Sequence, residues 1–343
     1  MSTTESTARR ATIKEVAEAA GVSRSTASRA LSGTGYVAEN VRARVRAAAK
    51  ELGYVVDATA RSLKQQSSRL VGVVVSDLRN AFYSAFAAGA AHACRTAGYT
   101  MVLLDDRGHT EDETAAAETF VALRVAGVVG TPVSASLSAF LARHRVPVVE
   151  ADRRFAEDSV SAVVVDNRAA ARSTTEHLLA LGHRRIALLL DETDWTTGRD
   201  RAAGYADALR AAGLPEDPSL KVPTGWDAEA ARAAAVSLLQ RPDRPTALFA
   251  GNNLLAEGAW RAAADLGLSI PDDVSLVAFD DAPWMSMVTP GVTAVRQDPE
   301  AIGRAAVTTL VAELAGEQRG PSTVVVPTTM IHRGSTARPT QPA

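Results

Sequence analysis

The sequence predicts a small all-α unit followed by a large α/β region built from doubly wound parallel sheets. Apolar residues recur at helical spacing up to Gly53, whereas short apolar runs alternate with alanine-rich helical stretches from Leu70 onward. The charge also changes along the chain, from basic at the front to acidic behind. With 343 residues, of which 46% are hydrophobic, the chain is long enough for two or three compact units.

Three helices are predicted in the front unit, after a polar leader over residues 1–11 that we expect to be disordered. The first helix begins after Thr12, which forms a capping-box pattern with Glu15. Ser23 is a typical cap for a second helix over SRSTASRAL. A third helix is predicted to end at Gly53, because glycine favours the left-handed conformation that follows many helices. Together these helices would form one small head.

The region after Leu70 alternates buried-strand patterns with helical stretches, which is typical of parallel sheets covered on both faces. Such sheets bind ligands beyond the carboxyl ends of their strands, so a cleft between two lobes is the expected ligand site. No internal sequence repeat of 20 to 50 residues is found. The strand candidates are LVGVVVSD, YTMVLLDD, AGVVGT, VPVVEAD, SAVVVD, RIALLLD, TALFAG, VSLVAFD and VVVPTTMI.

The distribution of charge indicates which unit could contact nucleic acid. Residues 1–69 contain 12 Lys or Arg against 6 Asp or Glu, whereas the remainder contains 25 against 33. A basic unit gains from phosphate attraction and counterion release, and an acidic one is repelled. We therefore expect only the head to contact DNA.

Targeting and redox signals are few. The single cysteine, Cys94, cannot form an intramolecular disulfide, and nothing near it has metal-ligand spacing. The N-terminus lacks an apolar signal segment, and no stretch approaches the ~20 apolar residues of a membrane span. We expect a cytoplasmic protein with no metal or cofactor and no membrane partner.

The turn between the first two predicted helices has the pattern of a helix-turn-helix motif. In TIKEVAEAAGVSRSTASRAL, the small residue Ala17 lies four positions before Gly21. Two helices can cross closely at such an alanine, and the turn needs a residue that accepts positive φ. An ordinary helical hairpin is the alternative, but the position in a basic front unit favours DNA binding.

TIKEVAEAAGVSRSTASRAL, VRARVRAAAKELGY and ARSLK together resemble the head of the LacI/GalR family of transcription regulators. The resemblance implies that the second helix lies in the major groove of DNA. An arginine there suits guanine O6 and N7, although phosphate contact or solvent is the alternative. The implied base-reading residues are Arg24, Ser25 and Arg29, and the phosphate-positioning residues are Ser23, Thr26 and Ser28.

The ARSLK stretch resembles the family's hinge helix, which folds on the operator and inserts a leucine into the minor groove. The implied hinge residues are Ala60, Arg61, Leu63 and Lys64, with Leu63 as the wedge, and a plain linker is the alternative. The head departs from the family at Ala38, where a Ser or Thr cap is common before the third helix. We expect a weaker cap there.

The resemblance continues to about residue 336 through markers that include RNAFYSAF, VPVVEADRR, VVVDNRAAARSTTEHLLALGHRRIALL, ALFAGNN, VSLVAFDD and HRGST. It implies a type I periplasmic-binding-protein-like core of two lobes joined by three crossover strands. The expected organisation is a leader at 1–11, a helix-turn-helix DNA-binding domain at 12–56, a hinge at 57–68, a two-lobed effector-binding and dimerisation domain at 69–336, and a tail at 337–343.

The same resemblance implies a set of effector contacts. Carboxylates, amides and arginine can form paired hydrogen bonds with hydroxyls, and an aromatic ring can pack on a sugar face. A carbohydrate or related polyol is therefore the expected effector, although single residues could instead cap strands or belong to the core. Ala81 and Asn253 depart from the family pattern, and Glu150 is expected to add an acidic group near the pocket. The implied contacts are Phe82, Tyr83, Asp152, Arg201, Trp226, Asn252, Asp280 and Gln297.

No catalytic arrangement is evident in the sequence. The acidic pairs at 105–106 and 280–281 are adjacent residues, whose side chains should diverge at a strand end. We therefore expect a homodimeric, effector-controlled regulator that binds a palindromic operator as two half-sites. The resemblance implies a repressor, because most members of the family repress. The alternative is a cytoplasmic small-molecule binding protein of the same core fold that does not bind DNA.

Overall fold

The computed structural model describes residues 11–33, 35–54, 68–156, 159–191, 195–318 and 320–340. The chain divides into two compact units, Met1–Ser68 and Arg69–Ala343. The predicted hinge residues Ala60, Arg61, Leu63 and Lys64, and the leader apart from Ala11, lie outside the described residues. Among the helices that are described, none combines the length and apolar character needed to cross a membrane.

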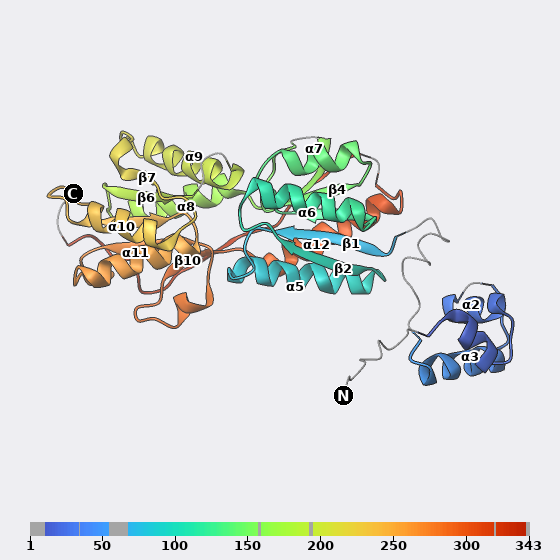
Figure 1. Ribbon diagram of the computed structural model, residues 1–343. Coiled ribbons are helices and arrows are strands. Elements are labelled where there is room, and N and C mark those ends of the chain that lie inside the picture. Colours follow the sequence, from blue (N-terminus) through green and yellow to red (C-terminus); the bar gives the residue numbers. More distant parts are fainter. Residues whose placement is uncertain are drawn as a thin grey trace, which may run out of the picture. The chain divides into compact units, whose positions relative to one another are not determined.

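The described residues of the head form three helices, α1 (Ile13–Ala19), α2 (Arg24–Ser32) and α3 (Glu39–Glu51), of which Figure 1 labels α2 and α3. The predicted capping box is confirmed, because the Glu15 amide donates to Thr12 Oγ1 and the Thr12 amide donates to Glu15 Oε2. Gly21 has φ +63°, as the turn requires. The buried residues of the three helices and the loop between α2 and α3 are Val16, Ala17, Ala20, Ala27, Ala30, Val37, Val45, Ala48 and Ala49.

The core unit contains two six-stranded sheets with the same strand order, β11-β5-β4-β3-β1-β2 and β12-β10-β9-β8-β6-β7. All strand pairs are parallel except β10 with β12. The first lobe contains β1 (Leu70–Val75), α5 (Ala81–Thr96), β2 (Thr100–Asp105), α6 (Thr110–Ala122), β3 (Gly127–Gly130), α7 (Ser136–Arg143), β4 (Val148–Ala151), β5 (Ser161–Val164), α12 (Pro299–Leu314) and β11 (Thr323–Val325).

The second lobe repeats this arrangement with its own elements: α8 (Asn167–Ala180), β6 (Ile186–Leu190), α9 (Thr196–Ala211), η2 (Pro218–Leu220), β7 (Lys221–Pro223), α10 (Ala228–Leu239), β8 (Ala247–Ala250), α11 (Asn253–Asp265), β9 (Ser275–Phe279), η3 (Pro283–Ser286), β10 (Thr293–Arg296) and β12 (Thr329–Ile331). The predicted fold class, a helical head with doubly wound parallel sheets, is therefore confirmed. Strands β7 and β10 were not predicted.

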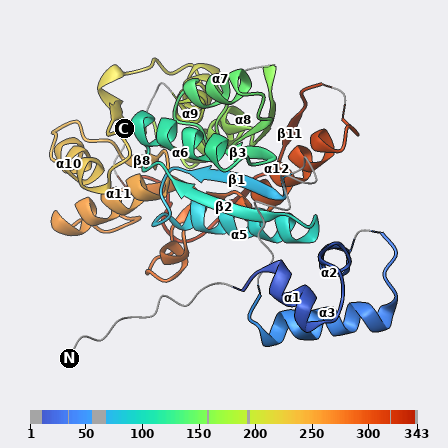
Figure 2. The same cartoon turned by 45° about the vertical axis from the view of Figure 1, so that its right-hand side comes forward.

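Alternation along the central strands explains why each sheet is covered on both faces. In β1, Val73 belongs to the core beneath α5 and α12, whereas Val74 belongs to the core beneath α6 and α7. In β6, Leu188 packs toward α8 and α9, and Leu189 packs toward α10 and α11. Figure 2 shows β1 and β2 between α5 on one side and α6 on the other. Successive side chains of a strand point to opposite faces, so each apolar run forms two layers of core.

The chain passes between the lobes three times. The crossovers lie between β5 and α8, between β10 and α12, and between β11 and β12. The prediction of VVVPTTMI as a single strand is wrong, because β11 and β12 belong to different sheets. Pro327 lies between them and has no amide proton for a sheet ladder.

The start of α3 offers a stability test, since its N-cap residue Ala38 forms no side-chain capping bond. Ala38→Ser supplies a hydroxyl that can accept from the first turn, so α3 should become more stable by about 1 kcal/mol. Amide hydrogen exchange of α3 in the full chain measures this change. Ser23→Ala, which removes the capping hydroxyl of α2, should destabilise its helix by a similar amount. Unchanged protection of α3 in the serine variant would contradict this assignment.

Candidate functional site

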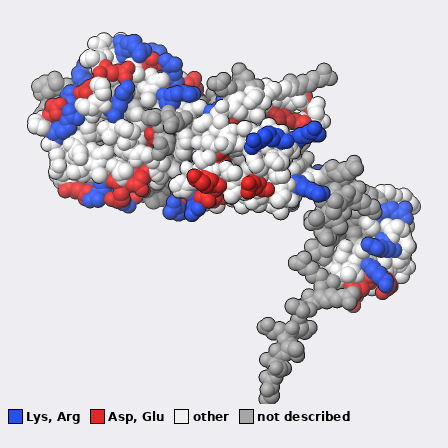
Figure 3. All heavy atoms as spheres, turned by 45° about the horizontal axis from the view of Figure 1, so that its top comes forward, with Lys and Arg blue, Asp and Glu red and all other residues white. Residues whose placement is uncertain are grey.

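The exposed face of α2 carries the residues predicted to read DNA bases. Arg24, Ser25 and Arg29 are exposed, and Ser28 lies half-buried beside them. These four positions share one side of a helix, and the buried alanines of α2 lie on another. Within the described ranges, neither Arg24 nor Arg29 forms an ion pair with another residue. Figure 3 shows basic side chains on the drawn face of the head.

The hydroxyl groups at the start of α2 are connected with one another. The Thr26 amide donates to Ser23 Oγ at 3.1 Å, and Ser23 Oγ lies 2.8 Å from Thr26 Oγ1 and 2.9 Å from Ser25 Oγ. Ser23 therefore caps the helix. Phosphate contact by Ser23, Thr26 and Ser28 stays a prediction.

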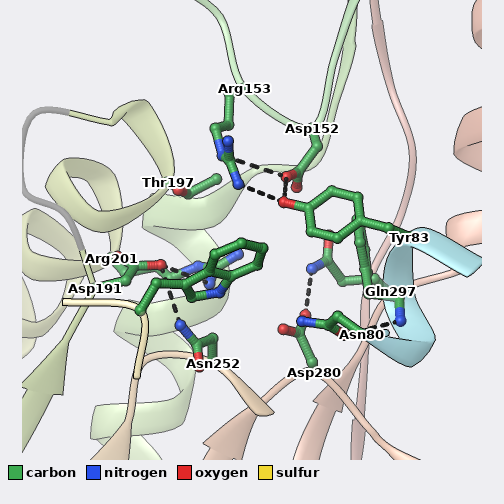
Figure 4. A pocket seen from close by; sticks show the side chains of 12 residues that line it. Asn80, Tyr83, Asp152, Arg153, Asp191, Thr197, Arg201, Asn252, Asp280 and Gln297 are labelled. Atoms are coloured by element: carbon green, nitrogen blue, oxygen red, sulfur yellow. Dashed lines mark hydrogen bonds and ion pairs between the residues drawn. The ribbon is translucent and has the colours of Figure 1, made fainter. Parts of the chain in front are cut away.

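A pocket lies where the carboxyl ends of the two sheets meet (Figure 4). Its free internal volume is only about 20 Å³, so the lining side chains nearly fill it. All eight residues predicted as effector contacts lie around it, together with four that were not predicted: Asn80, Arg153, Asp191 and Thr197. The lining residues are Asn80, Phe82, Tyr83, Asp152, Arg153, Asp191, Thr197, Arg201, Trp226, Asn252, Asp280 and Gln297.

Arg153 is the most connected of the residues that were missed. It is 2% exposed and follows Asp152 at the end of β4. Its Nη1 donates to Ser76 Oγ at 2.9 Å, its Nη2 donates to the Tyr83 hydroxyl, and its guanidinium stacks 3.6 Å from the ring centre of Trp195. Since Trp195 belongs to the second lobe, this stack joins the two lobes across the pocket.

Arg201 occupies the second lobe's side of the pocket. Its Nε donates to Asn167 Oδ1 at 2.9 Å, and its Nη1 donates to the Gly251 carbonyl at 2.5 Å. Its guanidinium lies 3.7 Å from the ring centre of Phe279 and 3.9 Å from Asp191 Oδ2. Helix α9 thus places a buried charge against the ends of β6, β8 and β9.

Two carboxylates of the pocket occupy equivalent places in the two lobes. Asp152 follows β4 with φ +65°, and Asp280 follows β9 with φ +67°. Left-handed backbone is uncommon for a residue with a side chain and occurs often at functional sites. Burial raises the pKa of both carboxyls above its ordinary value, and the neighbouring guanidiniums partly oppose this.

A reciprocal amide pair provides another contact between the lobes. Asn80 Nδ2 donates to Asn253 Oδ1 at 3.2 Å, and Asn253 Nδ2 donates to Asn80 Oδ1 at 2.9 Å. An aspartate at position 253 could form only the first of these bonds. The departure from the family pattern noted at Asn253 therefore has a direct structural role.

The expectation that Glu150 adds charge to the pocket is wrong. Its Oε1 accepts from Ser138 Oγ at 2.7 Å, and its Oε2 accepts from the amides of Phe155 and Ala156 at 2.8 and 3.1 Å. Glu150 lies inside β4, so its side chain points to the other face from its neighbours. Its role is to hold the loop after β4.

The acidic pair at the end of β9 diverges as expected. Asp280 lines the pocket and accepts from Gln297 Nε2 at 2.5 Å. Asp281 instead contacts Arg296 Nη2 and Arg333 Nη1, both at 2.7 Å, outside the pocket. Two carboxyls with separate partners do not share a reacting atom. Among the residues that are described, no group of three or more His, Cys, Asp and Glu could hold a metal ion.

Comparisons with known proteins identify the same two parts, a DNA-binding head and a ligand-binding core. A family model described as bacterial regulatory proteins, lacI family, matches residues 12–57, and a periplasmic binding protein-like domain matches residues 175–336. The HTH-type transcriptional repressor PurR of Escherichia coli is 31% identical over 337 residues, covering 95% of this chain and 97% of that protein.

Two solved structures are similar over nearly the whole chain. The transcriptional regulator CelR in complex with cellobiose is 31% identical, with a TM-score of 0.73 over 95% of this chain and 100% of that chain. The Lac repressor dimer bound to operator and the anti-inducer ONPF is 28% identical, with a TM-score of 0.86 over 96% of this chain and 100% of that chain.

A helix-turn-helix head joined to a two-lobed core with an interlobe pocket defines a class: DNA-binding transcription regulators with a ligand-binding core. Within that class, the chain belongs to the LacI family of bacterial regulatory proteins. Its similar proteins are transcription regulators rather than enzymes.

The buried carboxyl of Asp106, which follows β2, should make the stability of the protein depend on pH. Asp106 is fully buried, and its Oδ2 has no partner within the described residues. Burial raises its pKa from 3.8 to about 7, although the Gly108 amide and Arg153 partly oppose this. Because the folded protein holds this proton more tightly than the unfolded chain, the contribution to stability is full below pH 3.8 and is lost as pH rises through about 7.

We therefore expect Asp106→Asn to remove part of this dependence. Between pH 4 and 8, the free energy of unfolding of the wild type should fall relative to that of the variant by roughly 2 to 4 kcal/mol. Urea unfolding of both proteins at several pH values measures the difference. Parallel pH profiles would contradict the assignment of a titrating carboxyl at this position.

Proposed function

We propose that the chain is a homodimeric repressor that binds a palindromic operator and releases or retains it according to a small polyhydroxylated effector. The main support for effector binding is the pocket, which is lined by side chains from both lobes. A ligand bound there contacts Tyr83 and Asp152 in one lobe and Arg201 and Asn252 in the other, so it favours the closed arrangement.

A carbohydrate or related polyol is the effector class that fits the lining. Carboxylate, amide and guanidinium groups form paired hydrogen bonds with hydroxyls, and Trp226 offers an aromatic surface for an apolar ring face. The CelR structure contains cellobiose, and the Lac repressor structure contains ONPF. The assignment of Phe82, Tyr83, Asp152, Arg201, Trp226, Asn252, Asp280 and Gln297 as effector contacts is part of this proposal.

Base reading by α2 is the DNA half of the proposal. Arg24 and Arg29 present their guanidiniums on an exposed helix face, where each can reach O6 and N7 of a guanine. One head reads one half-site, so a two-fold dimer matches a palindrome. The Lac repressor structure is a dimer bound to operator, and PurR is named a repressor. Such a protein acts in the cytoplasm, where the operator lies.

The alternative, a small-molecule binding protein of the same core fold that does not bind DNA, makes no use of the head. Two arginines on an exposed face of α2, without ion-pair partners among the described residues, favour DNA binding over this alternative. Coupling of 1 to 3 kcal/mol between effector and operator binding is enough for control.

Selection of bound duplexes from a random pool, at fixed salt, tests the DNA half. Wild type should enrich a short palindrome, and Arg24→Ala should relax the preference at one position in each half-site by roughly 1 to 3 kcal/mol. Arg46→Ala, which removes an exposed arginine from α3 instead, is the control with the same change of charge. It should leave the selected sequence unchanged.

An Arg24→Ala protein that selects the same palindrome with the same preference, but binds every duplex more weakly, would mark Arg24 as a phosphate contact. The absence of any enriched sequence would mean either that a co-repressing effector is missing from the assay or that the head does not read DNA, and only the second outcome favours the alternative.

A further inference from the structure

A buried acceptor in the second lobe has no partner in the pocket. Asp191 follows β6 and is 5% exposed, and its Oδ1 accepts no hydrogen bond from any described residue. Its Oδ2 has only long contacts, 3.5 Å to Asn252 Nδ2 and 3.9 Å to Arg201 Nη1. An unsatisfied buried charged acceptor is unfavourable in the empty pocket, and it gains most from a donor that a ligand brings.

A second unsatisfied acceptor belongs to the same pocket. Gln297 is 6% exposed; its Nε2 donates to Asp280 Oδ1, but its Oε1 has no partner within the described ranges. Figure 4 shows Asp191 and Gln297 among the side chains that face the pocket. Asp191 Oδ1 and Gln297 Oε1 are both hydrogen-bond acceptors, so a ligand with hydrogen-bond donors at these two points would satisfy them.

The balance of charged groups in the pocket also favours a ligand without an anionic group. The carboxylates of Asp152, Asp191 and Asp280 outnumber the guanidiniums of Arg153 and Arg201. Both guanidiniums already donate to protein oxygens, as described above. A phosphate or carboxylate brought into this space would face the excess carboxylate in a setting with little solvent screening.

We propose that the pocket selects a small ring ligand that donates hydrogen bonds to Asp191 and Gln297 and carries no anionic group, with Asp191 as a specificity-determining residue. The donor is a hydroxyl or an ammonium group. This inference rests on the proposed function only in taking the pocket as the effector site.

A thermal-shift and calorimetric panel tests the inference. The probes are the aldopentoses and aldohexoses, their alditols and amino derivatives, and the matching sugar phosphates and uronic acids. Wild type should be stabilised by at least one neutral or amino compound, and its phosphorylated or oxidised counterpart should bind at least about tenfold more weakly. A preference for the amino compound assigns an ammonium to Asp191, whereas a preference for the neutral parent assigns a hydroxyl.

Asp191→Asn is the informative variant, because it keeps the shape of the side chain and removes its charge. We expect binding of the selected compound to weaken about tenfold or more, and discrimination against the anionic counterpart to shrink. Without any ligand, the variant should unfold at the same temperature as wild type or higher, since it loses a buried charge that has only long contacts. Asp265→Asn, on the surface of α11 and paired with Arg232, is the control and should bind as wild type does.

Three results would overturn the inference. An anionic sugar that binds wild type as tightly as its neutral parent removes the charge selectivity. Unchanged affinity and selectivity in Asp191→Asn removes Asp191 as the determinant. A panel in which no neutral or amino compound stabilises the protein contradicts the ligand class. Operator selection is run both without and with the panel compounds, so failure of the regulatory function would be detected separately.

Discussion

Two buried guanidiniums hold the ligand pocket together where the lobes meet. Arg153 donates to Ser76 and Tyr83 in the first lobe and stacks on Trp195 of the second, and Arg201 connects Asn167 with the end of β8. Each charge needs several partners because it lies out of reach of water. The strands end in polar side chains where these charges lie, and the apolar runs before them form the two core layers of each sheet.

The repeated topology of the lobes explains how one pocket can receive equivalent groups from both sides. Asp152 and Asp280 follow corresponding strands of two sheets with the same order, and both have left-handed backbone. Ligands of parallel sheets bind beyond the carboxyl ends of the strands. Here the carboxyl ends of the two sheets face each other, and three crossovers connect the lobes. A ligand that contacts both sheets therefore binds best when the lobes are closed. That dependence is what a ligand-controlled regulator needs.

Much of the fold was predictable from local patterns, and less of the site was. Apolar runs marked most strands and capping residues marked the helices of the head, whereas the short edge strand β7 carries little apolar signal. Asp191 is the last residue of the predicted strand RIALLLD, so the rule that ligands bind beyond strand carboxyl ends points to it. The stack of Arg153 on Trp195 joins residues far apart in the sequence, and no local pattern reports such a contact. Glu150 lies inside β4, where successive side chains alternate between the faces of the sheet, so its position next to pocket residues in the sequence does not place it in the pocket.

The central claim is that closure of the lobes controls the operator affinity of the head. The Arg154 amide of the first lobe donates to Thr196 Oγ1 of the second at 3.1 Å, so these two neighbouring positions are chosen for a pair of cysteines, and oxidation to the disulfide is verified by thiol titration. Cys94 is fully buried and should not interfere. Operator affinity of the Arg154→Cys/Thr196→Cys protein is measured at fixed salt, oxidised and then reduced, with each single variant as control. We expect the two states to differ by roughly 5- to 150-fold. Equal affinity in the locked and released states would contradict the account.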